Sequence, residues 1–367
     1  MHGKKIIALI LILPFFFLRA PALSVSAHSA ILYDPVSEKA LFEKDADERR
    51  PMASTTKIMT AVCALDYGNP EDQVLIKREY TLVEGSSMYL KAGEVLSLNC
   101  LLHGLLLLSG NDAAKAIAGH LSGSDSAFAK LMNEKAQELS LNNTHFENPS
   151  GLDGENHYTS ARDLARLAAY AMDMPEFREI ASKKQYHDGT RAMRNHNRLL
   201  WQYDGADGVK TGFTKRSGRC LVSSAERQGR RLVVATLNAP SDWSDHTQLL
   251  NYGFSLFSDK TLAKEGEPVL TVPVVGGISG GVAVFCPEEI TYSLTDEENQ
   301  NLKREFFGPR FAYAPVKRGG LYGTMRFTLN GKIIAETPVY YHDSVPVKEK
   351  QKSGGFFSKI AEFFGFC

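Results

Sequence analysis

Three short groups of residues in this chain combine side chains that are suited to nucleophilic catalysis. The first is Ser54-Thr55-Thr56-Lys57, in which a serine hydroxyl and a lysine amine are three residues apart. In a helix such residues share one face, so the amine approaches the hydroxyl. Burial lowers the pKa of a lysine until it can act as a base. Alone the pattern is weak, because a helix-capping Ser54 with an exposed Lys57 would have the same spacing.

The second and third groups are Ser109-Gly110-Asn111 and Lys210-Thr211-Gly212. Ser109 and Asn111 interrupt an apolar helical run, which predicts polar side chains at a loop apex, although simple capping of the next helix gives the same pattern. The third group falls on a predicted strand. Its glycine allows a ligand to lie close to the backbone, and its lysine and threonine can hold a carboxylate. An ordinary edge-strand lysine is the alternative.

The elements that must position these groups form one predicted α+β domain over residues 28–258. Alternating apolar residues predict two early strands at 29–33 and 40–43. Three late strands are predicted at 208–214, 219–224 and 231–237. Helices, including 54–65 and 246–257, fill and close the segment. This order predicts a five-stranded antiparallel sheet assembled from both ends of the domain, with a helical cluster.

Residues 259–346 form a second, smaller domain that is predicted to be all-β. Asn330-Gly331 separates two strand-like runs and is a strong signal for a type I′ hairpin. We find no group of catalytic side chains in this domain.

Composition sets limits on the class of function. The chain has 42 basic and 42 acidic residues, so it has no net charge and nothing favours nucleic-acid binding. Five scattered cysteines form no disulfide framework and no CxxC or Cys/His cluster for a metal. We therefore expect neither a metal nor a cofactor, and we expect Cys63 and Cys100 to be buried thiols.

The amino terminus has the layout of a secretory signal peptide over residues 1–27. Two lysines precede an apolar run at 6–18, which is too short to span a bilayer, and Val25-Ser26-Ala27 supplies small residues for cleavage. An uncleaved anchor is the alternative. Export places the protein at the outer face of the cytoplasmic membrane or outside the cell.

The last segment, residues 347–367, is a polar linker followed by an amphipathic run. Its aromatic residues recur at helical spacing from Phe356 to Phe364, opposite Lys359 and Glu362. Such a helix is typical of peripheral attachment to a membrane surface. Docking of the same helix on the second domain is the alternative.

Taken together, the three motifs resemble the penicillin-binding serine acyl-transferases. The chain is most similar to the serine D-alanyl-D-alanine carboxypeptidases, which are low-molecular-mass penicillin-binding proteins of peptidase family S11. Further matching stretches are 51–60 (PMASTTKIMT), 108–113 (LSGNDA), 151–153 (GLD), 158–164 (YTSARDL) and 208–212 (GVKTG). The resemblance extends over essentially the whole chain.

The resemblance implies removal of the terminal D-alanine from the stem pentapeptide of peptidoglycan, with β-lactams as inhibitors that acylate the same serine. It implies Ser54 as nucleophile, Lys57 as general base and Ser109 as proton relay. Oxyanion donors would be the backbone N–H groups of Ser54 and Phe213. The residues implied in substrate binding are Asn111, Lys210, Thr211, Gly212, Phe213, Ser87 and Arg198.

One departure concerns the arginine that some family members place beyond the third motif to hold the substrate carboxylate. Here the region reads Asp242-Trp243-Ser244-Asp245-His246 and has no arginine. Arg198 or Arg216 are the candidates to replace it.

Two other functions fit the motifs less well. A β-lactamase usually has Asp where Gly110 stands and a glutamate that activates the deacylating water; here Glu147 is followed by Asn148-Pro149. A catalytically idle peptidoglycan-binding scaffold would not need all five of the reactive residues, which are Ser54, Lys57, Ser109, Asn111 and Lys210. Endopeptidase or transpeptidase side activities depend on the shape of the cleft and stay open.

Overall fold

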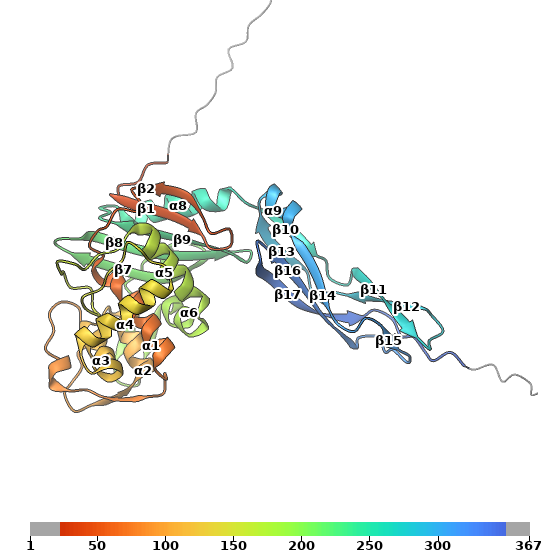
Figure 1. Cartoon of the computed structure of the whole chain (residues 1–367), viewed down its shortest axis with the longest axis horizontal. Coiled ribbons are helices and arrows are strands. Elements are labelled where there is room, and N and C mark those ends of the chain that lie inside the picture. Colours follow the sequence, from red (N-terminus) through yellow and green to blue (C-terminus); the bar gives the residue numbers. More distant parts are fainter. Residues whose placement is uncertain (1–22, 350–367) are drawn as a thin grey trace, which may run out of the picture.

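The computed structural model describes residues 23–349, in two domains that lie side by side (Figure 1). The predicted amphipathic helix after Gly355, most of the predicted signal segment and Cys367 lie outside the described residues. Within 23–349 no helix is long and apolar enough to cross a membrane.

The first domain is built on a five-stranded antiparallel sheet with the strand order β2-β1-β9-β8-β7. This confirms the prediction that one sheet is assembled from both ends of the segment. The strands are β1 Ser29–Asp34, β2 Lys39–Lys44, β7 Ala206–Thr214, β8 Gly218–Arg227 and β9 Arg230–Leu237.

Helices cover both faces of this sheet, because alternate side chains along each strand point to opposite sides. Ile31 packs into the helical cluster, whereas its neighbour Leu32 packs against α8 (Asp242–Ser255) on the other face. The helical cluster consists of α1 Lys57–Tyr67, α2 Leu98–Leu107, α3 Asn111–Ser122, α4 Asp125–Glu138, α5 Ala161–Asp173 and α6 Pro175–Ser182. Short elements complete the domain: η1 Ala53–Thr56, η2 Arg78–Tyr80, α7 Leu199–Gln202, β3 Gln73–Leu75, β4 Val95–Ser97, β5 Gln185–His187 and β6 Ala192–Arg194.

The predicted helix at 54–65 starts differently from the expectation. Residues Ala53–Thr56 form a 3₁₀ turn, and the α-helix begins only at Lys57. The hydroxyls of Thr55 and Thr56 donate to the carbonyls three residues earlier, at 2.7 and 2.8 Å, and such local bonds favour the tighter turn. The closing helix α8 likewise begins four residues before the predicted start.

Residues that precede β1 belong to the packing of the first domain. Ala27 is fully buried and Val25 nearly so. The backbone N–H of Ser26 and that of Ala27 both donate to the carboxylate of Asp245, at 2.9 and 3.0 Å. Lys44 also donates to the Ala27 carbonyl at 2.6 Å. Residues 25–27 are therefore bonded to α8 and packed into the first domain.

The second domain is all-β, as predicted. Its main sheet has the order β14-β16-β17-β12-β11-β15, and β10 pairs with β13. Asn330 and Gly331 both have positive φ, 51° and 81°, as a type I′ turn requires. The elements are β10 Ser258–Ala263, β11 Pro268–Val275, β12 Gly281–Phe285, β13 Ile290–Leu294, α9 Asp296–Asn301, β14 Lys303–Phe307, β15 Ala312–Tyr313, β16 Leu321–Leu329 and β17 Lys332–Tyr341.

A buried charge cluster joins the two domains. Arg230, at the start of β9, has no solvent exposure and pairs with Asp34 at the end of β1. The same guanidinium lies 2.8 Å from Glu298 on α9 of the second domain, and 4.0 Å from the centre of the Phe257 ring. The two domains are therefore connected by an ion-pair network as well as by the chain.

Candidate active site

Ser54 and Lys57 meet at the junction between η1 and α1. The Nζ atom of Lys57 lies 3.0 Å from the Oγ atom of Ser54. Ser54 is partly exposed, whereas Lys57 is completely buried. The pair therefore has an accessible hydroxyl backed by an amine that solvent does not reach.

The other contacts of Lys57 decide how its amine is oriented. Nζ donates to Oδ1 of Asn111 at 2.7 Å and to the carbonyl of Ser150. The Asn111 amide is oriented by its own nitrogen, which donates to the Glu84 carbonyl at 2.7 Å. Because a carbonyl oxygen only accepts, these two partners take both N–H groups of a neutral amine. The lone pair is left to face the Ser54 hydroxyl.

The electrostatic surroundings favour the neutral form of Lys57. Burial holds the pKa of Lys57 well below its usual value, and the positive charge of Lys210 lowers it further, against an opposing effect of Asp112. Burial also lowers the pKa of Lys210, to about 7. Two lysines in one dry site thus compete for protons, which is how a lysine becomes a base near neutral pH.

Ser109 is positioned by the break between α2 and α3. Its backbone has a φ of +61°, a conformation that residues other than glycine rarely adopt, and its side chain is buried at the cleft wall. Gly110 follows as the N-cap of α3, and Asn111 is the first residue of that helix. Strained backbone of this kind is common at functional sites.

The third motif lies on β7, at the edge of the sheet. A Cβ atom added to Gly212 would lie 3.0 Å from the backbone nitrogen of Ser54. The missing side chain thus lets the strand approach η1 closely. Lys210 is buried and donates from Nζ to the carbonyl of Thr211 at 2.9 Å, while the Phe213 side chain is 65% exposed.

A cleft of about 880 Å³ opens over these elements. Six residues expected at the site contribute to its lining: Ser54, Ser109, Arg198, Thr211, Gly212 and Phe213. Lys57, Asn111 and Lys210 lie behind the surface, among the buried residues. The structure thus brings together residues that are up to 159 positions apart in the chain, from Ser54 to Phe213.

Ser87 is the expected site residue that the structure does not place in this cleft. Its hydroxyl donates to the Asp112 carboxylate, which also accepts the backbone N–H groups of Met88 and Leu90 at 3.0 Å each. These bonds turn the Ser87 side chain inward. Its neighbour Ser86 lines the cleft in its place.

Comparison with protein families decides the assignment. The model of the D-alanyl-D-alanine carboxypeptidase family matches residues 17–241, the part of the chain that contains all three motifs. The chain belongs to this family. A second model, described as the C-terminal domain of penicillin-binding protein 5, matches residues 257–347 and so covers the all-β domain.

Relatives of this carboxypeptidase family align with nearly the whole chain. The D-alanyl-D-alanine carboxypeptidase DacF of Bacillus subtilis is 33% identical over 363 residues, covering 95% of this chain and 91% of the relative. DacC of Escherichia coli is 34% identical, with coverage of 95% and 92%. The crystal structure of penicillin-binding protein 5 from Haemophilus influenzae superposes with a TM-score of 0.63 at 30% identity, covering 88% of this chain and 98% of that one.

The carboxypeptidase cleft also contains residues that sequence reasoning missed. Its lining also includes Arg219, Asp242, Trp243, Arg194, Asn195, His196 and Trp201. Of the two arginines expected to replace the missing one, Arg198 lines the cleft. Arg216 is not among the lining residues and donates to the Gly154 carbonyl at 2.8 Å. Nothing in the local pattern around Arg219 distinguished it from other strand arginines.

The glutamate weighed for a β-lactamase does not join this cleft. Glu147 is exposed, and a Cβ atom on Gly154 would lie 1.8 Å from its Oε2 atom. Among the described residues that line the cleft, the one carboxylate is Asp242, which is paired with Arg219.

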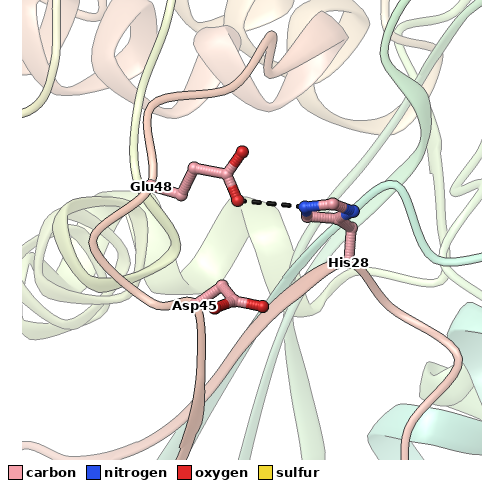
Figure 2. A group of neighbouring side chains, drawn as sticks. All are labelled: His28, Asp45 and Glu48. Carbon is pink, nitrogen blue, oxygen red and sulfur yellow. Dashed lines mark hydrogen bonds and ion pairs between the residues drawn. The ribbon is translucent and has the colours of Figure 1, made fainter.

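One group of side chains within residues 23–349 has ligand atoms close enough to hold a metal ion. His28, Asp45 and Glu48 lie together on the surface (Figure 2), with His28 Nε2 3.0 Å from Glu48. All three are exposed, and Glu48 is also paired with Arg50 at 2.7 Å. None of them lines the cleft, and we assign them no part in the chemistry.

Proposed function

We propose that this chain is a serine-type D-Ala-D-Ala carboxypeptidase that removes the terminal D-alanine from peptidoglycan stem pentapeptides through an acyl-enzyme on Ser54. The observation that carries the proposal is the orientation of the Lys57 amine. In the neutral form that burial favours, two carbonyl oxygens accept its N–H groups, so its lone pair faces a hydroxyl 3.0 Å away at the floor of an open cleft.

Acylation starts when Ser54 Oγ attacks the carbonyl carbon of the penultimate D-alanine while Lys57 takes the hydroxyl proton. The oxyanion is held by the backbone N–H groups of Ser54 and Phe213, and the close approach of the neighbouring Gly212 to the Ser54 nitrogen supports this assignment. The C–N bond then breaks. Ser109 relays the proton from Lys57 to the leaving nitrogen, which returns Lys57 to its neutral form, and free D-alanine departs.

Deacylation uses water as the second nucleophile. Water adds to the ester carbonyl and gives its proton to Lys57, and the ester bond to Ser54 breaks as the serine recovers its proton. The product is the shortened stem peptide, and the enzyme returns to its starting state. No step requires a redox partner, since the bonds broken and formed are those of acyl transfer.

Substrate is held along β7 and the loop before α3. Lys210 and Thr211 bind near the terminal carboxylate, and Gly212 allows the peptide backbone to lie against the strand. An amide nitrogen carries two N–H groups, and one in Asn111 donates to Glu84, which leaves the second for the substrate amide. Arg198 supplies a further cation at the cleft wall.

The first test is intact mass after mixing the full chain with benzylpenicillin. We expect one persistent adduct, its absence in Ser54→Ala, and release of D-alanine from diacetyl-L-Lys-D-Ala-D-Ala by the wild type. Rapid return to the unmodified mass with the drug consumed would identify a β-lactamase instead. An unmodified protein with intact drug would identify the idle scaffold.

The two termini of the chain determine where the enzyme acts. The amino-terminal segment directs export, so that the enzyme works outside the cytoplasmic membrane, where peptidoglycan is built. The second domain is a spacer, and the aromatic segment from Phe356 to Cys367 associates with the membrane surface. Deletion of that segment should release the protein from membranes and leave hydrolysis of soluble peptide unchanged. A truncated protein that still sediments with membranes would contradict this role.

A further inference from the structure

We propose that Arg219, held in place by Asp242 and Trp243, recognises the free terminal carboxylate of the substrate. The inference rests on the proposed function and deepens it. A cation that binds this carboxylate limits the enzyme to peptides with a free C-terminus. The inference places that cation on β8, a strand that carries none of the three motifs.

Strand register places Arg219 beside the reacting centre. It pairs with Phe213 across β7 and β8, and Thr211 pairs with Leu221. Paired residues share a face of a sheet, as do residues two apart, so the side chains of Thr211, Phe213 and Arg219 lie on one face. Thr211, Phe213 and Arg219 also line the cleft together with Ser54. A carboxylate held at Thr211 is therefore within the part of the cleft that Arg219 faces.

Asp242 and Trp243 orient the guanidinium. An Arg219 Nη atom lies 2.9 Å from the carboxylate of Asp242, which is buried at the first residue of α8 and accepts the Trp243 N–H at 2.9 Å. A carboxylate is favoured at a helix N-terminus. The Arg219 guanidinium also lies 6.0 Å from the centre of the Trp243 ring. A side chain fixed on two sides loses little entropy when it binds a ligand.

Enough donors remain for a substrate. A guanidinium has five N–H groups. Within residues 23–349, the guanidinium of Arg219 is paired with one carboxylate, that of Asp242. The side chain remains 45% exposed toward solvent. A planar fork with free donors matches a carboxylate in bidentate geometry.

The other cations near the site are less suited to this role. Lys210 is fully buried, it already donates to Thr211, and its pKa of about 7 leaves it only partly charged at neutral pH. The Arg198 guanidinium also lies 6.0 Å from the centre of the Trp243 ring, but Arg198 forms no ion pair within the described residues. Arg219 combines a permanent charge with a fixed position.

The test compares substrates with and without the carboxylate. The full-length wild type, Arg219→Gln, Arg219→Lys, Arg198→Gln and Arg216→Gln are each acylated with benzylpenicillin and with its methyl ester, and assayed for D-alanine release from diacetyl-L-Lys-D-Ala-D-Ala. Arg216 is the matched control, because it lies in the turn that joins β7 to β8, three residues before Arg219, but outside the cleft lining.

We expect Arg219→Gln to lower the acylation constant for benzylpenicillin and kcat/KM for the peptide by about 10- to 100-fold, as loss of a charge-assisted bond implies. The rate with the methyl ester should stay within about twofold, and Arg219→Lys should recover part of the loss. Equal slowing with acid and ester, or a selective loss in Arg198→Gln alone, would overturn the inference. A wild type that is not acylated and releases no D-alanine would instead overturn the proposed function.

Discussion

The amine of Lys57 lies 3.0 Å from the hydroxyl of Ser54, although the two residues belong to different elements. Ser54 is in the 3₁₀ turn, and Lys57 is the first residue of α1. The turn leaves the hydroxyl at the cleft, while the helix takes the amine into the core. This division separates an accessible nucleophile from a base that is protected from water.

The rate of acylation should depend on pH in a bell-shaped manner. It rises as Lys57 loses its proton, because burial and Lys210 hold the pKa of Lys57 well below the usual range. It falls as Lys210, whose pKa is about 7, loses a charge that adds to the attraction of Arg219 for the substrate carboxylate. Acylation by benzylpenicillin, measured from pH 5 to 10, tests this. In Lys210→Arg the falling limb should move to higher pH; a limb that stays in place would show that another group causes it.

Replacement of Lys57 by methionine should lower the acylation rate by about 10²- to 10⁴-fold, the usual contribution of a general base. It also leaves Oδ1 of Asn111 and the Ser150 carbonyl without their buried donor. We therefore expect a loss of about 1–3 kcal/mol in the free energy of unfolding, measured in urea.

Ser54→Ala is the matched control for that experiment. It removes the nucleophile but leaves both carbonyls bonded to Lys57, so acylation should vanish while stability changes little. If Ser54→Ala were destabilised as much as Lys57→Met, the stabilising role assigned to the buried amine would be wrong.

Substitution of Gly151 should affect the acylation rate as well as the stability of the fold. Its φ is +88°, and an added Cβ atom would lie 2.0 Å from the carbonyl oxygen of Ala53, next to the nucleophile. Gly93 has nearly the same φ, +90°, but open space around it. Both alanine variants should lose about 1–2 kcal/mol from the left-handed conformation.

Only Gly151→Ala should also slow acylation, by about tenfold or more, because a misplaced nucleophile loses its alignment. Chemical denaturation and acylation rates of the two variants decide the matter. Equal rates in both variants would mean that η1 tolerates the displacement.

The ion pairs of Arg230 should contribute strongly to stability. Arg230→Ala leaves Asp34 buried without its partner and removes the link to Glu298, so we expect a loss of about 3–5 kcal/mol. Lys332→Ala removes a second contact between the domains, to Glu38 at 2.8 Å, but this pair is exposed. It should cost about 1 kcal/mol or less. Thermal unfolding of both variants compares them, and similar losses would contradict the importance of burial.

The packing of residues 25–27 predicts where an export signal is cleaved. Cleavage after Ala27 would remove the two N–H groups that hold the buried Asp245 carboxylate. The small residues of Ala20-Pro21-Ala22 offer an earlier site. We therefore expect the mature protein, secreted by a host that processes it, to begin at Leu23 and not at His28, the start that the Val25-Ser26-Ala27 pattern predicts. Intact mass or amino-terminal sequencing measures this directly, and a chain beginning at His28 would show that the Asp245 contacts are dispensable.

Local patterns predicted much of the fold because they report backbone periodicity. Strands β1, β2, β7, β8 and β9 and the hairpin at Asn330-Gly331 were all found within a few residues of their observed bounds. The start of α1 was misplaced, since the 3₁₀ turn depends on threonine hydroxyls that bond to carbonyls of the same turn. Ser87 was expected at the site from the resemblance alone, which does not show that its hydroxyl bonds to Asp112 and that Ser86 lines the cleft.

The sequence by itself determined the reactive pair and the family. Ser54 and Lys57 are neighbours through local geometry, which spacing reveals. Only the tertiary structure decided what surrounds them. Asn111 and Ser150 supply the oxygens that accept the N–H groups of Lys57. Arg219 is held by Asp242, which lies on a helix that follows the next strand. Contacts between residues so far apart depend on how the sheet and helices pack, and no local pattern records that packing.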